Sequence, residues 1–230
     1  MSRLPICTLT GVDEKTDRGH LRELMCEFPI AEFGVLWSDT RAGHGCYPSK
    51  RFIDNFTWRF RADPIALHVC GGAVERLARG DEDIVTIARR CPRVQINAIL
   101  DAVALWKDRV EAILDLLPRQ EVILQHNASN QAFIAGFPER LRLAALFDRS
   151  GGRGLLPEAW PTSFQNRACG YAGGLGPDNL ERELPRIAAA ADPRQFWIDM
   201  ESSLRTNDVF DLDKCRKALE IASKWAGENP

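Results

Sequence analysis

Two segments place a reactive side chain beside small or polar residues. Cys7 lies in LPICTLTG, where a thiol held among threonines could act as a base if its pKa were lowered. Asp148 ends the apolar run LRLAALF before a glycine-rich stretch, and a carboxylate there could act as a general acid or base. Each residue also has a plainer interpretation. A buried cysteine is usually a small hydrophobic residue, and a loop aspartate often caps a turn.

A third segment, AGGLGPDNLERELPRIAAAA, joins paired glycines to the start of a helix. Gly173 and Gly174 would let backbone amides approach an anion, and Pro177 suits the first turn of a helix. Amide groups at a helix N-terminus are a common phosphate-binding arrangement. The segment therefore predicts a phosphate site, although a tight turn without a ligand would use the same glycines.

Eight short apolar runs predict the strands that must position these residues. The runs are five to seven residues long, suit strands buried on both faces, and begin near residues 4, 33, 65, 93, 121, 142, 168 and 195. Helical patterns fill several of the gaps, at 73–90, 100–117 and 212–226. Alternating strands and helices favour parallel pairing with right-handed crossovers, and eight such units can close. We expect an α/β fold in which residues 1–230 form a single (β/α)8 TIM barrel, with an open doubly wound sheet as the alternative.

Such a barrel binds its ligand at the end where the strands finish, which is built from the loops that follow them. The segment from Ser38 to Phe60 is long and is expected to form an extended loop after the second strand. His68, Cys70 and His126 also fall at or near strand ends. Either histidine could be a hydrogen-bonded packing residue, and without a ligand-spacing motif we expect no metal site.

Composition excludes several classes of function. Thirty basic and 32 acidic residues give a net charge of -2, so no overall positive field would hold nucleic acid or an anionic membrane. The seven cysteines are scattered without a CxxC pair, as expected of reduced thiols in the cytoplasm. The N-terminal segment turns polar before a secretory signal could form, and no stretch reaches about 18 apolar residues. We therefore expect a cytoplasmic protein with no nucleic-acid or membrane partner.

In chain order, these segments resemble the phosphoribosylanthranilate isomerase family, a β/α barrel of tryptophan biosynthesis. The family's ICGxT motif is similar to residues 6–10, and its AGGLxPxNV segment matches residues 172–180 almost residue for residue. Phe147-Asp148 followed by Gly151-Gly152-Arg153-Gly154 resembles the end of the family's sixth strand and its GGTG-like loop. Residues 47–52 resemble its YPKSPRYV segment.

The resemblance implies a role for each matching residue. Cys7 would be the general base, Asp148 the general acid and Arg51 the partner of a substrate carboxylate. Phosphate and substrate binding would fall to residues of the fourth, seventh and eighth units, namely Gln95, Gly173, Gly174, Ser202 and Ser203. The family's reaction needs neither a metal ion nor an organic cofactor.

Two strands depart from the family pattern. The eighth strand normally reads DVSSGVE, but residues 199–205 read DMESSLR, so a glycine is missing and Glu201 adds negative charge beside the expected phosphate. Arg205 could offset that charge. On the fourth strand, the family's QLHG appears as residues 95–98, with Asn97 in place of the histidine.

The sequence thus predicts an isomerase that performs an Amadori rearrangement of a phosphorylated aminosugar, as a monomer or homodimer. Asp148 would protonate the ring oxygen, and Cys7 would remove the adjacent carbon-bound proton. Two alternatives stay open. One is a barrel enzyme of the same family with a different phosphorylated or carboxylated substrate. The other is a non-catalytic barrel that binds a small molecule or a protein.

Overall fold

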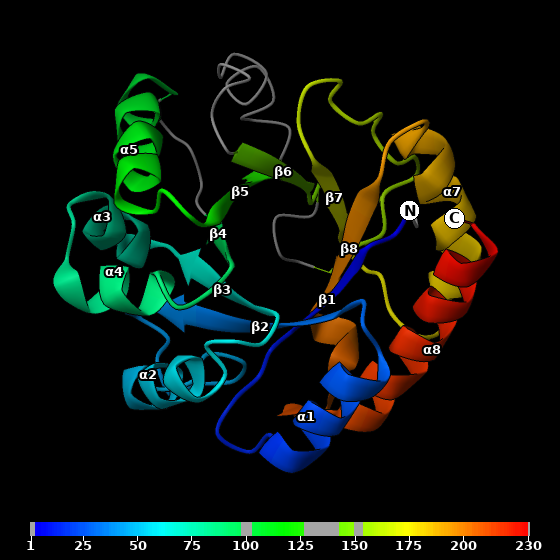
Figure 1. The fold of residues 1–230 in the computed structure, drawn as a ribbon, viewed down its shortest axis with the longest axis horizontal. Helices are drawn as coiled ribbons and strands as arrows, with labels where there is room; N and C mark the ends of the chain where they lie inside the picture. The colour runs from blue at the N-terminus through cyan, green and yellow to red at the C-terminus, as the bar shows by residue number, and fades with distance from the viewer. Residues whose placement is uncertain (1–2, 98–102, 127–142, 150–153, 230) are drawn as a thin grey trace.

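Eight parallel strands form a closed barrel in which each strand pairs with the next and β8 pairs with β1 (Figure 1). The computed structural model describes residues 3–97, 103–126, 143–149 and 154–229. The predicted TIM barrel is confirmed, and the open doubly wound sheet is wrong. Closure leaves no unpaired sheet edge among the eight strands.

The strands follow the eight apolar runs closely. They are β1 Ile6–Thr10, β2 Ala31–Ser38, β3 Ile65–Cys70, β4 Arg93–Asn97, β5 Glu121–His126, β6 Leu143–Phe147, β7 Cys169–Ala172 and β8 Phe196–Met200. Most of their residues are buried, because helices cover the outside and side chains fill the inside.

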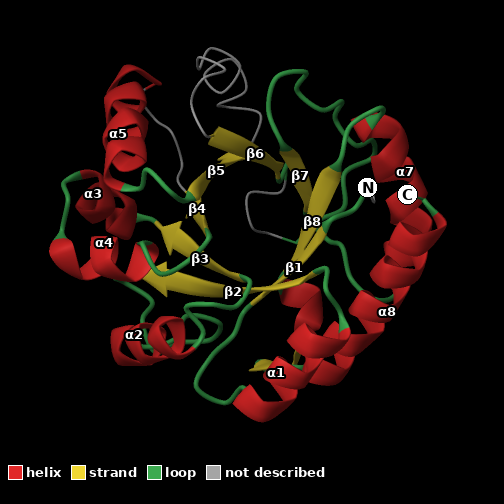
Figure 2. Ribbon diagram, viewed as in Figure 1, coloured by secondary structure: helices red, strands yellow, loops and turns green. Residues whose placement is uncertain are grey.

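The described helices lie outside the ring of strands (Figure 2). They are α1 Arg18–Glu27, α2 Lys50–Arg59, α3 Gly72–Ala78, α4 Glu82–Ala88, α5 Val103–Leu116, α7 Leu180–Ala191 and α8 Leu212–Glu228. A 3-10 turn, η1 Ser202–Leu204, and a small hairpin of β9 Arg205–Thr206 and β10 Val209–Phe210 lead from β8 into α8. None of these described helices has both the length and the apolar character needed to cross a membrane.

Two connections differ from the expected alternation. The helix predicted over 73–90 is two helices, α3 and α4, because the chain turns at 79–81 and the Asp81 side chain caps a new helix by accepting from the Asp83 amide. Between β6 and β7, the described residues 154–168 contain no helix. Strands and helices therefore do not alternate throughout the described chain.

Alternate residues of each strand face opposite sides of the barrel wall. Leu9, Val35, Leu67 and Ile198 belong to the main hydrophobic core that includes the surrounding helices. The inward positions carry a much smaller apolar cluster around Ile123, Ala144, Leu146 and Trp197. Much of the remaining interior is polar, and this polar interior positions the candidate site.

Candidate active site

The end of the barrel where the strands begin, here called the lower end, holds a buried ionic network. Arg93 donates to Glu32 Oε1 at 2.8 Å and to Glu121 Oε2 at 2.7 Å. Thr8 Oγ1 donates to the same Glu32 oxygen at 2.8 Å. The Arg93 guanidinium also stacks 4.4 Å from the centroid of the Trp197 ring. This network pairs opposite charges with one another below the mouth, so its role is structural.

The opposite end, the mouth, carries three carboxylates from the ends of β6 and β8: Asp148, Asp199 and Glu201. We call them the mouth carboxylates. Each accepts a hydrogen bond from a neighbouring strand or loop. Asp199 accepts from Thr10 Oγ1 at 2.7 Å, Asp148 accepts from Gln125 Nε2 at 2.8 Å, and Glu201 accepts from Cys46 Sγ at 3.6 Å.

Burial and mutual repulsion favour the protonated forms of two of these groups. Burial raises the pKa of Asp199 well above its usual value. The Thr10 hydrogen bond lowers this pKa, whereas the charges of Glu201, Glu32 and Asp148 raise it further. Burial also raises the pKa of Glu201, with a further contribution from Asp148, although Cys46, Arg205 and Arg41 oppose it. Buried carboxyl groups with raised pKa values, close to a further carboxyl group, are an arrangement that acid-base catalysis uses.

The loop between β2 and α2 contributes to the mouth, but it is shorter than the predicted loop of residues 38–60, because Ser49 caps a helix over residues 50–59. Its Cys46 reaches Glu201, and its Tyr47 hydroxyl accepts a hydrogen bond from Arg41 at 3.1 Å. Burial, with the nearby Cys70 and Glu201 groups, raises the pKa of Tyr47 to about 12. The phenol therefore stays protonated and neutral beside the carboxylates.

Gln95, predicted to bind substrate, lies in the barrel interior and is 3% exposed. Its Nε2 atom contacts His68 Nδ1 at 3.2 Å and Asn97 Oδ1 at 3.0 Å. Asn97 in turn donates to Cys70 Sγ at 3.6 Å. The polar residues of β3 and β4 are thus linked to one another, and Gln95 orients His68.

The assignment of Cys7 as the general base needs correction. Thr8 and Thr10 bond carboxylates inside the barrel, so Cys7, which alternates with them, lies on the outer face of β1. It is fully buried in the main hydrophobic core and is close enough to Cys215 of α8 to raise that thiol's pKa. Burial, followed by the charges of Asp199 and Glu32, raises the pKa of Cys7 itself. Cys7 is therefore a small hydrophobic residue packed between the barrel and α8.

The loops after β6, β7 and β8 meet, as the predicted phosphate site requires, but they pack tightly on one another. Gly173 and Gly174 have φ values of 105° and 67°, and a Cβ atom on Gly174 would lie 2.5 Å from the Leu156 backbone nitrogen. Ser203 Oγ donates to the Leu175 carbonyl at 2.5 Å, and Ser202 is exposed. These groups join loop to loop, and whether an anion binds beside them stays a prediction. Residues 150–153, which the resemblance included, lie outside the described residues.

Two cations named from the sequence have different surroundings. Arg51 is exposed on α2. Arg205 donates to Asp13 Oδ2 at 2.8 Å and to the Gly11 carbonyl at 3.0 Å, so it offsets the charge of Glu201 only in part. Arg41 is the loop cation that sequence reasoning missed, and its position six residues before Tyr47 gave no motif to find it.

His126 packs edge-on against the rings of Phe147 and Phe164, with centroids 4.8 and 5.7 Å away, on the outer face of the barrel wall. It is therefore a packing residue among the described neighbours. Within the described part of the chain, no group of three or more His, Cys, Asp or Glu side chains is placed to hold a metal ion.

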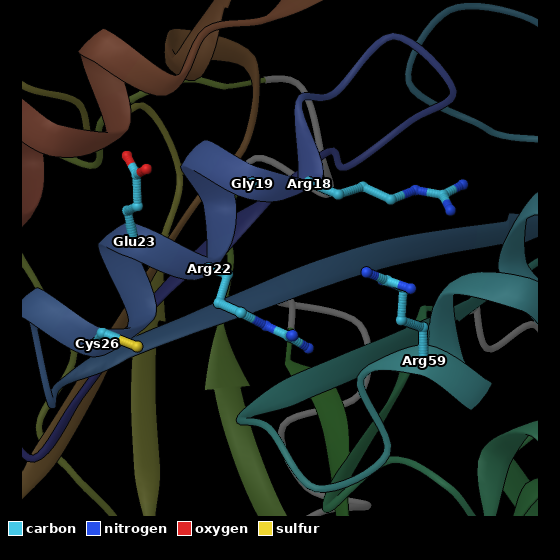
Figure 3. A pocket seen from close by; sticks show the side chains of 6 residues that line it. All are labelled: Arg18, Gly19, Arg22, Glu23, Cys26 and Arg59. Carbon is cyan, nitrogen blue, oxygen red and sulfur yellow. The ribbon is translucent and has the colours of Figure 1, made fainter.

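A cavity of about 390 Å³ lies on the outer surface beside α1 and α2, away from the mouth (Figure 3). Arg18, Arg22 and Arg59 line it and point into the space between the two helices. Arg18 already stacks on Phe52, and Arg22 lies 3.7 Å from Asp63. Because this cavity holds no converging acid-base groups, we place the candidate active site at the mouth.

Comparison with known proteins supports the fold. Neither a family model nor a curated protein sequence matches the chain. A solved structure of N-(5'-phosphoribosyl)anthranilate isomerase from Pyrococcus furiosus is similar, with a TM-score of 0.60, 11% identity, and coverage of 95% of this chain and 98% of that chain. The structural resemblance expected from the sequence is thus confirmed at the level of the fold.

Two further structures have the same level of similarity. One, described as native KDPGal, has a TM-score of 0.54 and 12% identity, and the match covers 99% of this chain and 97% of that one. The other is a designed, cube-shaped, highly porous protein cage, with a TM-score of 0.54, 12% identity, and coverage of 98% and 74%. At these identities the likenesses establish the barrel, and the chemistry must be argued from the site.

Proposed function

We propose that this protein is an enzyme, an isomerase that moves a proton between carbon and oxygen in a small sugar-like carbonyl substrate. The observation that carries the proposal is the set of mouth carboxylates, in which burial and the charge of Asp148 favour the protonated form of Glu201. Asp148 is the base and Glu201 the acid. This reverses the role expected for Asp148 and removes Cys7 from the reaction.

The proposed step balances with these two groups alone. Asp148 takes the proton from the carbon next to the carbonyl, and the released electron pair forms a carbon-carbon double bond. The carbonyl oxygen takes a proton from Glu201, which gives an enediol. Return of a proton to the former carbonyl carbon, with loss of one from the neighbouring hydroxyl, completes an aldose-ketose exchange.

The positions of the lysines favour this chemistry over imine formation with the protein. All six lysines lie in helices or loops, and none lies in a barrel strand. They are Lys15, Lys50, Lys107, Lys214, Lys217 and Lys224. A nucleophilic lysine in the interior would be needed to form a Schiff base with the substrate. Carboxylates are the reactive groups that the described mouth offers.

A phosphorylated aminosugar, with an Amadori rearrangement as in phosphoribosylanthranilate isomerase, is the second candidate. The similar fold and the glycines of the β7 loop favour it. The negative mouth and the tight packing of the three loops favour an unphosphorylated substrate instead. Matched pairs of sugars with and without phosphate separate the two candidates.

The test follows deuterium entering a substrate from D2O by NMR. The panel is D-ribulose and N-phenyl-D-ribosylamine, an aminosugar with its nitrogen on C1, each with and without a terminal phosphate. We expect exchange beside the carbonyl or its imine in at least one member, and a loss of about 100-fold or more in Asp148→Asn and Glu201→Gln. Asp178→Asn is the matched control, because Asp178 is exposed and pairs with Lys217. Binding without exchange would make the protein a non-catalytic barrel and overturn the proposal.

A further inference from the structure

His68 is a buried side chain that the proposed acid-base step does not use. It lies on the inner face of β3, one inward position below Cys70, and is 1% exposed. Its Nδ1 atom contacts Gln95 Nε2, while its Nε2 atom is buried and has no hydrogen-bond partner among the described residues. A buried polar atom without a partner carries a free-energy cost, so its persistence calls for an explanation.

The surrounding hydrogen bonds fix which ring nitrogen carries the proton. Asn97 donates its amide to Cys70 Sγ, so its Oδ1 atom is free to accept from Gln95 Nε2. The second hydrogen of Gln95 Nε2 then points to His68 Nδ1, which must accept it. A neutral imidazole that accepts at Nδ1 carries its hydrogen on Nε2. The unpartnered atom is therefore a donor.

The ring is also held neutral. Burial, with a smaller effect of the Arg93 charge, lowers the pKa of His68 to about 3. A neutral imidazole donates a hydrogen bond without handing over its proton, which suits stabilisation of a developing oxyanion. The residue combines a fixed tautomer, a fixed orientation and an unused donor inside the barrel.

We propose that the Nε2–H group of His68 binds the substrate's carbonyl oxygen and stabilises the negative charge that develops there during isomerisation. This inference rests on the proposed function, in which that oxygen gains electron density as Asp148 removes the carbon-bound proton. Glu201 then supplies the proton, and His68 supplies only the hydrogen bond. Gln95 is a positioning residue that acts through His68.

The first experiment measures the ring directly. Nitrogen-15 NMR of the side chain should show His68 protonated at Nε2 and not at Nδ1, with no titration between pH 5 and pH 9. At least one of the four sugars should shift the Nε2–H signal on addition. An Nδ1–H tautomer overturns the inference, as does an Nε2–H signal that responds to no sugar, which would mark a bond to a resident water.

The second experiment separates a catalytic role from a structural one. His68→Leu removes the donor, and we expect kcat for deuterium exchange to fall about 100-fold or more with little change in KM. His68→Gln restores a neutral N–H group at a similar distance from the backbone and should recover most of the loss. Equal kcat in the two variants, with both folded by circular dichroism, overturns the inference.

The two proposals fail in different ways. Exchange activity with an unresponsive His68 leaves the proposed isomerase standing and removes His68 from it. A responsive His68 without exchange keeps the oxygen-binding donor and removes the isomerase.

Discussion

The two ends of the barrel interior handle buried charge in opposite ways. At the lower end, the carboxylates of Glu32 and Glu121 share Arg93, which lies 2.8 and 2.7 Å from them. At the mouth, no described Lys or Arg side chain forms a salt bridge with Asp199 or Glu201, and burial raises the pKa of both. Arg93 therefore offsets the carboxylate charge at the lower end, whereas burial favours the protonated forms of Asp199 and Glu201 at the mouth. Buried carboxyl groups with raised pKa values are candidates for acid-base chemistry.

The largest predicted effect comes from breaking the pairing at the lower end. Arg93→Met keeps an apolar group over Trp197 but leaves the buried Glu32 carboxylate and the partly exposed Glu121 carboxylate without their cation. We expect the free energy of unfolding to fall by about 3–5 kcal/mol, the usual cost of removing one partner of a buried pair. Urea denaturation measures this loss of unfolding free energy.

Arg79→Met is the control, because Arg79 is 81% exposed and lies 4.0 Å from Glu75. This variant should change the free energy of unfolding by less than about 0.5 kcal/mol. Similar losses in both variants would show that the lower network does not stabilise the fold.

The packing of the mouth loops gives the next prediction. Gly174→Ala adds a Cβ atom 2.5 Å from the Leu156 nitrogen at a φ of 67°. Gly43→Ala has a similar positive φ of 81° with open space around the Cβ, so it reports backbone strain alone. We expect Gly174→Ala to be less stable than Gly43→Ala by about 1–3 kcal/mol, the cost of overpacking. Thermal unfolding of the pair measures the difference, and equal stability would mean that the loops separate freely.

The sequence predicted the wall of the barrel better than its interior. Runs such as IALHV and RVQIN mark strands because burial on both faces demands continuous apolar character. Asp148 and the β7 loop were placed at the mouth by the order of the elements alone. The face of Cys7 was not predictable in this way, because a motif match shifted by one residue along a strand moves a side chain to the other side.

The missed site residues share one physical reason. Asp199 becomes an acid candidate only when the closed barrel buries it and brings Glu32 and Asp148 near it, because burial and these charges raise its pKa. Cys46 likewise meets Glu201 from the β2–α2 loop, and it lies just outside the segment 47–52 that the family resemblance covered. Gln95 was named as a substrate ligand, yet its partner His68 is the residue whose Nε2 atom has no hydrogen-bond partner in the described part of the chain. Pairings of this kind are set by closure of the barrel, which leaves no local pattern in the sequence.

The third prediction tests the difference between the two ends of the barrel interior through the pH dependence of stability. An aspartate with a raised pKa in the folded state binds its proton more tightly there than in the unfolded chain, where the pKa is about 3.9. Asp199 therefore supports folding most at low pH, and this contribution is lost as pH rises through the folded-state pKa. Asp199→Asn should remove that dependence and unfold at a higher temperature than the unmodified protein at pH 8.

Asp178→Asn is the control with the opposite sign. The hydrogen bond from Lys217 lowers the pKa of Asp178. The small contribution of Asp178 to stability is therefore present at neutral pH and is lost as pH falls. Melting temperatures at pH 5 and pH 8 for both variants measure the two slopes. A melting temperature for Asp199→Asn that is lower at pH 8 than that of the unmodified protein would show that Asp199 is ionised and stabilised in the mouth.

The smallest predicted effect concerns Cys7, which belongs to neither end of the interior. Its thiol packs between β1 and α8, so Cys7→Ala should lower the free energy of unfolding by about 1 kcal/mol through lost packing. Deuterium exchange per folded molecule should stay within about twofold of the unmodified protein, because the alanine methyl also faces the helices and leaves Thr8 and Thr10 in place.

Cys91→Ala is the matched control for packing alone, because Cys91 is another fully buried thiol outside the barrel interior. A fall of about 100-fold in exchange for Cys7→Ala, with Cys91→Ala unaffected, would place the thiol in the reaction and would mean that β1 presents its other face to the substrate. The proton-holding groups would then have to be sought on both sides of the barrel wall, and the contrast between the two ends of the interior would no longer locate the chemistry.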